Sequence, residues 1–143
     1  MEYTKLGQTG LEVSKLCLGC MSFSDPNRGF HAGWVLDEEA SRKIIKKALD
    51  AGINFFDTAD VYNGGESEKS IGRFIKGKQG KIFVATKCGR QINPHTAAGY
   101  TREAVVKYTE DSLKRLDVEC LDLIQLHCPP TDVFYKPEIF QTL

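Results

Sequence analysis

The 143-residue sequence lacks the main features of membrane-spanning, secreted and nucleic-acid-binding proteins. No apolar run approaches the roughly 20 residues that a membrane helix needs, and the first residues contain no apolar signal-peptide core. Neither sign of charge dominates, because 19 Lys and Arg residues balance 19 Asp and Glu residues. This balance argues against binding to nucleic acid or a membrane surface. Five cysteines without the spacing of a disulfide framework favour a cytoplasmic protein.

The sequence also has no low-complexity segment, linker or run of like charges that would mark a second domain. Its length fits one domain, and 41% hydrophobic with 27% charged residues is an ordinary globular composition. A Gly-x-Gly-x-x-Gly turn after a strand, the usual dinucleotide-binding fingerprint, is absent. We therefore expect a single domain over residues 1–143.

Four short apolar runs alternate with helix-like stretches along the chain. The runs predict strands and comprise residues 16–19, 54–57, 82–87 and 121–127. Successive runs start roughly 30 to 40 residues apart, the size of a strand–helix–strand unit. The middle runs are apolar at consecutive positions, which favours strands covered on both faces, as in a parallel sheet. Helices are expected after the N-cap residue Asp37, over residues 67–75 and after Thr101.

A β-hairpin is predicted before this alternation begins. Residues 3–6 and 11–14 flank Gly7-Gln8-Thr9-Gly10, and glycines in a short connection are typical of a hairpin turn. We assign residues 1–15 to the hairpin and residues 16–143 to four strand–helix units, of which the last is incomplete.

Alternating strands and helices leave two architectures open, a doubly wound sheet and a (β/α) barrel. Length favours the open sheet, because a complete barrel needs about 250 residues. Asp57, Lys87 and His127 favour the barrel, because each stands at the end of a different predicted strand. Barrel enzymes gather their catalytic residues from the carboxyl ends of several strands. We therefore predict the α/β barrel.

Asp57, Tyr62, Lys87 and His127 have the residue types of a proton-donating site. A lysine ammonium beside a phenol hydroxyl stabilises the phenolate and makes the phenol a better acid. Asp57 would pair with Lys87, and His127 would direct a hydrogen bond toward the same oxygen. Such a set suits carbonyl reduction with hydride from a cofactor. Taken singly, each residue has a structural alternative: a turn cap, a surface lysine, a core histidine or a half-buried tyrosine.

The residues around these positions resemble the aldo-keto reductase family. The segment FFDTADVYNGGESE, residues 55–68, is similar to the family signature, and residues 84–87 are similar to its lysine strand. Residues 6–23 resemble the family's N-terminal hairpin and first strand, and residues 113–127 its third helix and histidine strand. The hairpin and residues 64–68 are most similar to the bacterial and potassium-channel β-subunit-like branch.

The resemblance implies a (β/α)8 TIM barrel that reduces aldehydes or ketones with a nicotinamide cofactor, usually NADPH. By position, Tyr62 would be the proton donor, with Lys87 and Asp57 as the pair that tunes it. His127 would orient the substrate carbonyl. Two other interpretations stay open: a non-catalytic nucleotide-sensing or regulatory module, and a half-barrel that self-associates without catalysis.

The resemblance also implies where the cofactor binds and how much of the barrel is present. Cys20 and Met21 fall where the family contacts the cofactor, and Asp57 often contacts its nicotinamide ribose. The chain would encode the N-terminal half of the barrel, and the second half would supply most of the cofactor site. A half-barrel leaves two strand edges and its inner face open. We expect the missing C-terminal half, or self-association, to cover them.

Cysteines and loop aromatics are further candidates, whereas no metal site is predicted. Cys17 and Cys20 stand three residues apart on a strand and so point to opposite faces, which opposes a shared metal. Cys20 and Cys88 follow strand ends, as does Cys128, and a thiol exposed near Lys87 is expected to be more acidic and prone to oxidation.

A loop after the first predicted strand carries Phe23, Phe30 and Trp34. Aromatic side chains at the catalytic face would line a pocket for an apolar substrate. The same side chains would equally form a small cluster that pins the loop. The sequence leaves both interpretations open.

Overall fold

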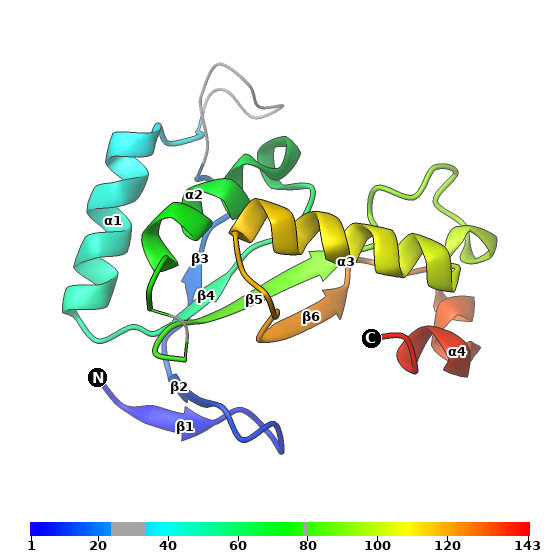
Figure 1. The fold of residues 1–143 in the computed structure, drawn as a ribbon, viewed down its shortest axis with the longest axis horizontal. Coiled ribbons are helices and arrows are strands. Elements are labelled where there is room, and N and C mark those ends of the chain that lie inside the picture. Colours follow the sequence, from blue (N-terminus) through cyan, green and yellow to red (C-terminus); the bar gives the residue numbers. More distant parts are fainter. Residues whose placement is uncertain (24–33, 79) are drawn as a thin grey trace.

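The structure, a computed structural model, describes residues 1–23, 34–78 and 80–143 (Figure 1). Within these ranges the chain forms a four-stranded parallel sheet and a separate two-stranded hairpin. The sheet consists of β3 (Leu18–Gly19), β4 (Phe55–Asp57), β5 (Phe83–Cys88) and β6 (Leu123–Leu126). Its order is β3-β4-β5-β6, so the winding never reverses direction as it does in a doubly wound sheet.

Three helices connect the strands and cover one face of the sheet (Figure 1). They are α1 (Glu38–Asp50), α2 (Glu66–Ile75) and α3 (Arg102–Leu116). The Asp37 carboxylate accepts the Ala40 N–H at 2.7 Å, and the Thr101 hydroxyl accepts the Ala104 N–H at 3.2 Å. These N-caps explain why α1 and α3 begin where the sequence predicts. Helix α2 begins one residue earlier than expected.

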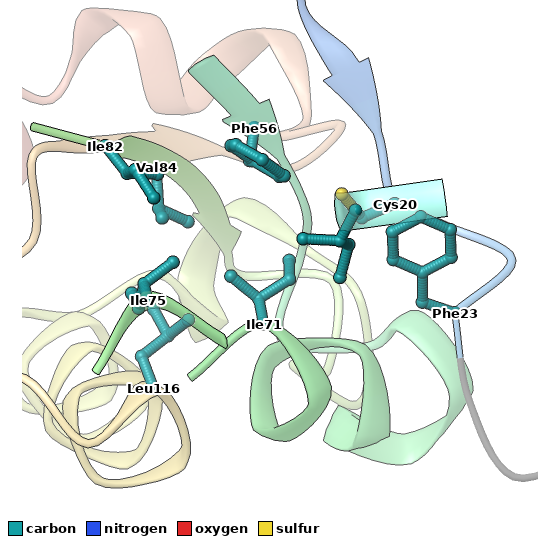
Figure 2. Packing of buried hydrophobic residues seen from close by; sticks show 9 residues of the cluster. Cys20, Phe23, Phe56, Ile71, Ile75, Ile82, Val84 and Leu116 are labelled. Atoms are coloured by element: carbon teal, nitrogen blue, oxygen red, sulfur yellow. The ribbon is translucent and has the colours of Figure 1, made fainter. Parts of the chain in front are cut away.

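The core lies between the sheet and these helices. Phe56 of β4 and Val84 of β5 point toward Ile71 and Ile75 of α2 (Figure 2). The same cluster contains Cys20, Phe23, Ile45, Ile82 and Leu116. Every member is at most 6% exposed. Burying a large apolar side chain stabilises the fold by about 1.5–3 kcal/mol, so this layer fixes the strands in place.

The opposite face of the sheet is only partly covered. Successive strand residues point to opposite faces, so Phe55, Phe83 and Leu123 point away from the helices, and all three are half-buried. Gln125 on the same face is exposed. In a (β/α) barrel this face lines the filled interior. Within the described residues β3 and β6 each have a single neighbour, so the sheet has two edges.

The N-terminal hairpin forms as predicted. Strand β1 (Tyr3–Lys5) pairs antiparallel with β2 (Glu12–Ser14). Asn54, the residue before β4, ties the hairpin to the sheet. Its side-chain oxygen accepts the Ser14 N–H at 2.6 Å, and its side-chain amide donates to the Glu12 carbonyl at 3.1 Å.

The segment after β6 forms the incomplete last helical part expected from the sequence. It forms a 3-10 helix, η3 (Thr131–Tyr135), and then α4 (Pro137–Phe140), a single turn. The Thr142 hydroxyl donates to the Glu138 carbonyl at 2.7 Å and so satisfies an acceptor at the end of this turn. Across the described part of the chain, no helix is long and apolar enough to span a bilayer.

Candidate active site

Asp57, Tyr62, Lys87 and His127 come together at the carboxyl edge of the sheet. Asp57 is the last residue of β4, Lys87 is the penultimate residue of β5, and His127 directly follows β6. Because parallel strands end at the same edge, side chains on the uncovered face converge there. Tyr62 is added by the 3-10 helix η1 (Tyr62–Gly65) in the loop after β4.

Lys87 is the centre of this group. Its ammonium nitrogen donates to Asp57 Oδ1 at 2.6 Å and to the Thr58 carbonyl at 2.7 Å, and lies 3.4 Å from Tyr62 Oη. An ammonium has three protons, and these three partners can use all of them. The Lys87 side chain is only 16% exposed, which strengthens its attraction to Asp57 relative to a solvated pair. The lysine is therefore held with a proton directed at the phenol oxygen.

His127 faces Tyr62 across the site. The ring centroids are 5.8 Å apart and the rings meet edge to face at 88°. The His127 backbone N–H donates to the Cys88 carbonyl at 2.7 Å, which fixes its position beside β5. Burial, and then the positive charges of Lys87 and Arg90, lower the pKa of His127. The imidazole is therefore neutral at neutral pH.

Cys20 and Met21, the residues expected to contact a cofactor, follow β3 at the same edge. The Met21 side chain is 47% exposed, and its carbonyl accepts the Asn63 side-chain amide at 2.8 Å. The Cys20 side chain has no exposed surface and belongs to the core cluster. Its backbone N–H donates to the Asp57 carbonyl and its carbonyl accepts the Ser67 hydroxyl, so Cys20 has no exposed group at this edge. The cofactor contacts of Cys20, Met21 and Asp57 stay predictions.

The expectation of acidic, oxidation-prone thiols is wrong for Cys20 and Cys88. Both are completely buried, and burial raises the pKa of Cys88 to about 12 and raises the pKa of Cys20 as well. For Cys20, desolvation disfavours the thiolate more strongly than the Lys87 ammonium favours it, and for Cys88 the negative charges of Asp60 and Glu68 add to the effect of burial. Nor do the described residues contain a group of three or more His, Cys, Asp or Glu side chains that could hold a metal ion.

The loop aromatics separate into different environments. Phe23 is 2% exposed and packs in the core cluster, so it does not line a substrate pocket. Trp34 is 47% exposed. Phe30 lies outside the described residues.

A buried polar network that the sequence patterns above do not predict lies on the helix-covered side of the sheet, next to the site. The Thr86 hydroxyl donates to Glu68 Oε1 at 2.5 Å, and Arg115 Nε donates to Glu68 Oε2 at 2.5 Å. Glu68 and Thr86 are both completely buried. The signal was available in α2, because Glu68 stands on the same helical stripe as Ile71 and Ile75. A carboxylate on an apolar stripe indicates a buried ion pair.

Asp60 is a second buried carboxyl group near the site. Its residue is 1% exposed, and its backbone N–H donates to the Lys87 carbonyl at 3.1 Å. Burial, and then the negative charge of Glu68, raise the pKa of Asp60 to about 6. The Arg115 guanidinium acts in the opposite direction. Asp60 is therefore largely ionised at neutral pH at a cost to the folded state.

Comparison with known proteins identifies the family. The model of the aldo/keto reductase family matches residues 15–143, so the chain belongs to this family. It is 40% identical over 139 residues to the oxidoreductase YrpG of Bacillus subtilis, covering 89% of this chain and 40% of YrpG. It is 34% identical over 148 residues to versiconal hemiacetal acetate reductase of Aspergillus parasiticus, covering 89% of this chain and 42% of that protein.

A solved structure places the sheet in its larger architecture. The holo form of the aldo-keto reductase AKR11C1 from Bacillus halodurans superimposes with a TM-score of 0.80 and 34% sequence identity. The match covers 99% of this chain and 45% of AKR11C1, and the chain spans about 40% of the length of its curated relatives. The solved relatives are (β/α)8 barrels, so β3–β6 supply four parallel strands of this barrel fold, which confirms the predicted fold class.

We expect an NMR titration to place the pKa of His127 below its ordinary value of 6.5. Lys87→Met should raise it, because the lysine charge disfavours the imidazolium. The His127 ring resonance, assigned by its loss in H127N, is the measurement, and Lys107→Met on the exposed face of α3 is the control. If the pKa of His127 were the same in K87M as in the wild-type protein, the result would contradict the described geometry.

We expect Asp60→Asn to stabilise the protein above neutral pH. The pKa of Asp60 is about 6 in the folded protein, above its ordinary value of 3.8. The stability that this carboxyl contributes is therefore present below about pH 3.8 and is lost as the pH rises through about 6. The asparagine amide does not ionise, so the variant should gain about 2–3 kcal/mol at about pH 8 and little at about pH 3.

Chemical unfolding at both pH values measures this difference. Asp132→Asn, at an exposed carboxylate, is the matched control. An Asp60→Asn effect of equal size at both pH values would show that ionisation of Asp60 is not its cause.

Proposed function

We propose that the chain carries the proton-donating site of an NADPH-dependent enzyme that reduces aldehydes or ketones to alcohols. The observation that carries this proposal is the Lys87 ammonium, which joins Asp57 to the Tyr62 hydroxyl at the carboxyl edge of a barrel sheet. Membership of the aldo/keto reductase family supports oxidoreduction. The name of the similar Aspergillus parasiticus reductase supports the direction of the reaction.

Tyr62 is the proton donor in this proposal. As a substrate carbonyl is reduced, its oxygen gains negative charge and needs a proton from an acid within hydrogen-bond distance. The Lys87 nitrogen, 3.4 Å from Tyr62 Oη, stabilises the phenolate that remains after the proton leaves. Asp57 accepts a 2.6 Å hydrogen bond from the same ammonium and balances its charge.

His127 orients the substrate carbonyl. Its lowered pKa keeps the ring neutral, so it donates a hydrogen bond without placing a second cation beside Lys87. Its edge-to-face contact with Tyr62 brings the two rings to the same part of the site. The Tyr62 hydroxyl and a His127 ring N–H therefore hold the carbonyl oxygen from two directions.

A nicotinamide cofactor supplies the hydride when it is bound. The residues at this edge fit the reacting end of such a cofactor. The Asp57 carboxylate is 36% exposed and can accept a hydrogen bond from a ribose hydroxyl. Met21, which is 47% exposed, offers an apolar contact near it, whereas Cys20 is completely buried.

Further polypeptide at β3 and β6 completes the barrel in this proposal. Those two strands are the edges of the described sheet, and its uncovered face carries half-buried Phe55 and exposed Gln125. Relatives are more than twice as long as the matched segment. The C-terminal half of a barrel, or a second copy of this chain, would cover this face and supply the rest of the cofactor site.

A reducing compartment suits the proposed enzyme. All five cysteines are free thiols. Free thiols are typical of cytosolic proteins, where disulfides are rare. We therefore place the protein in the cytoplasm, acting on a small carbonyl substrate.

Tyr62→Phe should lower kcat for carbonyl reduction by about 10²–10⁴-fold, because the phenol proton is lost while the ring remains. The Kd for NADPH should change less than about twofold, because the hydroxyl donates its proton to the substrate oxygen. Loss of NADPH absorbance with an aromatic aldehyde measures kcat, and a fluorescence titration measures Kd. Tyr108→Phe, on α3, is the matched control.

Wild-type turnover in Y62F would contradict the assignment of the proton donor. Tight NADPH binding by the wild-type protein with no turnover of any carbonyl substrate would instead support a nucleotide-sensing module. NADH in place of NADPH tests the proposed cofactor preference.

A further inference from the structure

The first turn of α2 lies directly behind the proposed catalytic residues. Side chains alternate along a strand, so Thr58 and Thr86 point toward the helices while Asp57 and Lys87, their neighbours in sequence, point the other way. Both threonines are completely buried. Asp57 is therefore followed by the Thr58 hydroxyl, and Lys87 is preceded by the Thr86 hydroxyl, on the opposite face of the sheet.

Ser67 anchors the end of β4 to α2. Its hydroxyl lies 2.8 Å from the Thr58 hydroxyl and donates to the Cys20 carbonyl at 2.7 Å. A hydroxyl has one proton, so Thr58 is the donor to Ser67. The Thr58 carbonyl in turn accepts a hydrogen bond from Lys87 at 2.7 Å. The helix, the residue after β3 and the residue after β4 are thus tied together.

Glu68 anchors the end of β5 to the same helix. It accepts the Thr86 hydroxyl at 2.5 Å on one carboxylate oxygen and Arg115 Nε at 2.5 Å on the other. Arg115 comes from the last turn of α3 and also donates to the Ser112 hydroxyl at 3.1 Å. A buried carboxylate without a cation would be costly, so Arg115 is what allows a charge at this position.

The Arg115 side chain also packs against the turn that carries Tyr62. A Cβ atom on Gly65 would lie 2.6 Å from Arg115 Cδ, so no side chain fits between them. Gly65 is the last residue of η1, which begins at Tyr62, and it adopts a left-handed φ of 90°. One ion pair therefore contacts both the strand that carries Lys87 and the turn that carries Tyr62.

We propose that Glu68 and Arg115 are positioning residues that set the distance between Lys87 and Tyr62. They act through the Thr86 hydroxyl on one side and the η1 turn on the other. The inference rests on the proposed function in so far as Lys87 and Tyr62 serve proton donation. Without the Glu68–Thr86 bond the end of β5 loses its tie to α2, and a misplacement of about 1 Å can cost about 10²-fold in rate.

Thr86→Val and Thr86→Ser form the central pair of variants. Valine keeps the size of the side chain without the hydroxyl, and serine keeps the hydroxyl. We expect T86V to lower kcat about tenfold to 10²-fold, with KM and the Kd for NADPH within about twofold of the wild-type values. T86S should retain most of kcat, because the bond to Glu68 is kept.

Glu68→Gln tests the carboxylate itself and should lower kcat in the same way. It leaves Arg115 without its ion-pair partner, so a loss of stability is expected. Circular dichroism and thermal unfolding show whether each variant is folded. Where E68Q does not fold, the Thr86 pair decides the question.

The pKa of His127 gives a readout that does not require turnover. Burial lowers this pKa, the charges of Lys87, Arg90 and His95 act in the same direction, and Asp57 opposes them. When the end of β5 is released, Lys87 loses its fixed position. The pKa of His127 in T86V should therefore shift toward the value in K87M, and in T86S it should stay at the wild-type value.

The outcomes separate positioning from a purely structural role. Reduced thermal stability of T86V with wild-type kcat and an unchanged His127 pKa would overturn the proposal. A rise in KM with unchanged kcat would overturn it as well. Inactivity of the wild-type protein with its barrel completed would refute the proposed function, while the His127 titration would still decide whether the Thr86–Glu68 bond positions Lys87.

Discussion

The ion pair between Lys87 and Asp57 is the interaction on which the rest of the site depends. It joins the carboxyl ends of β4 and β5 through a 2.6 Å hydrogen bond, and the shielding of Lys87 from solvent strengthens it. With two of its protons committed to Asp57 and Thr58, the ammonium directs the third at the Tyr62 phenol. Parallel strands make this possible, because their carboxyl ends lie at one edge.

The two faces of the sheet have different roles, one in the apolar core and the other in the proposed site. The helix-covered face carries Phe56 and Val84 in the apolar core and, beyond them, the buried hydroxyls that bind Ser67 and Glu68. The other face carries the charges of the proposed site. The bonds from Thr58 to Ser67 and from Thr86 to Glu68 hold the ends of β4 and β5 on the helix side. In our proposal this keeps Asp57 and Lys87 close together on the other face.

Local signals explain what the sequence predicts well. The apolar runs, the N-cap Asp37 and the polar residues at strand ends predict the elements and the convergence of the site. The position of Glu68 on the apolar stripe of α2 indicates a buried ion pair, but local patterns do not identify its partner, because Arg115 lies 47 residues away and arginine is common on surfaces. Cys88 was misjudged for a related reason: its burial is set by helix packing that lies outside the local sequence.

Transfer of deuterium from the cofactor to the product shows directly whether hydride reaches a carbonyl carbon at this site. NADPH carrying deuterium at nicotinamide C4, prepared separately in each stereochemical form, is incubated with an aromatic aldehyde and the protein whose barrel is completed. We expect one of the two forms to give an alcohol with deuterium on the former carbonyl carbon, seen by mass spectrometry. An unlabelled product from both forms, or no alcohol at all, would contradict hydride transfer to a carbonyl at this site.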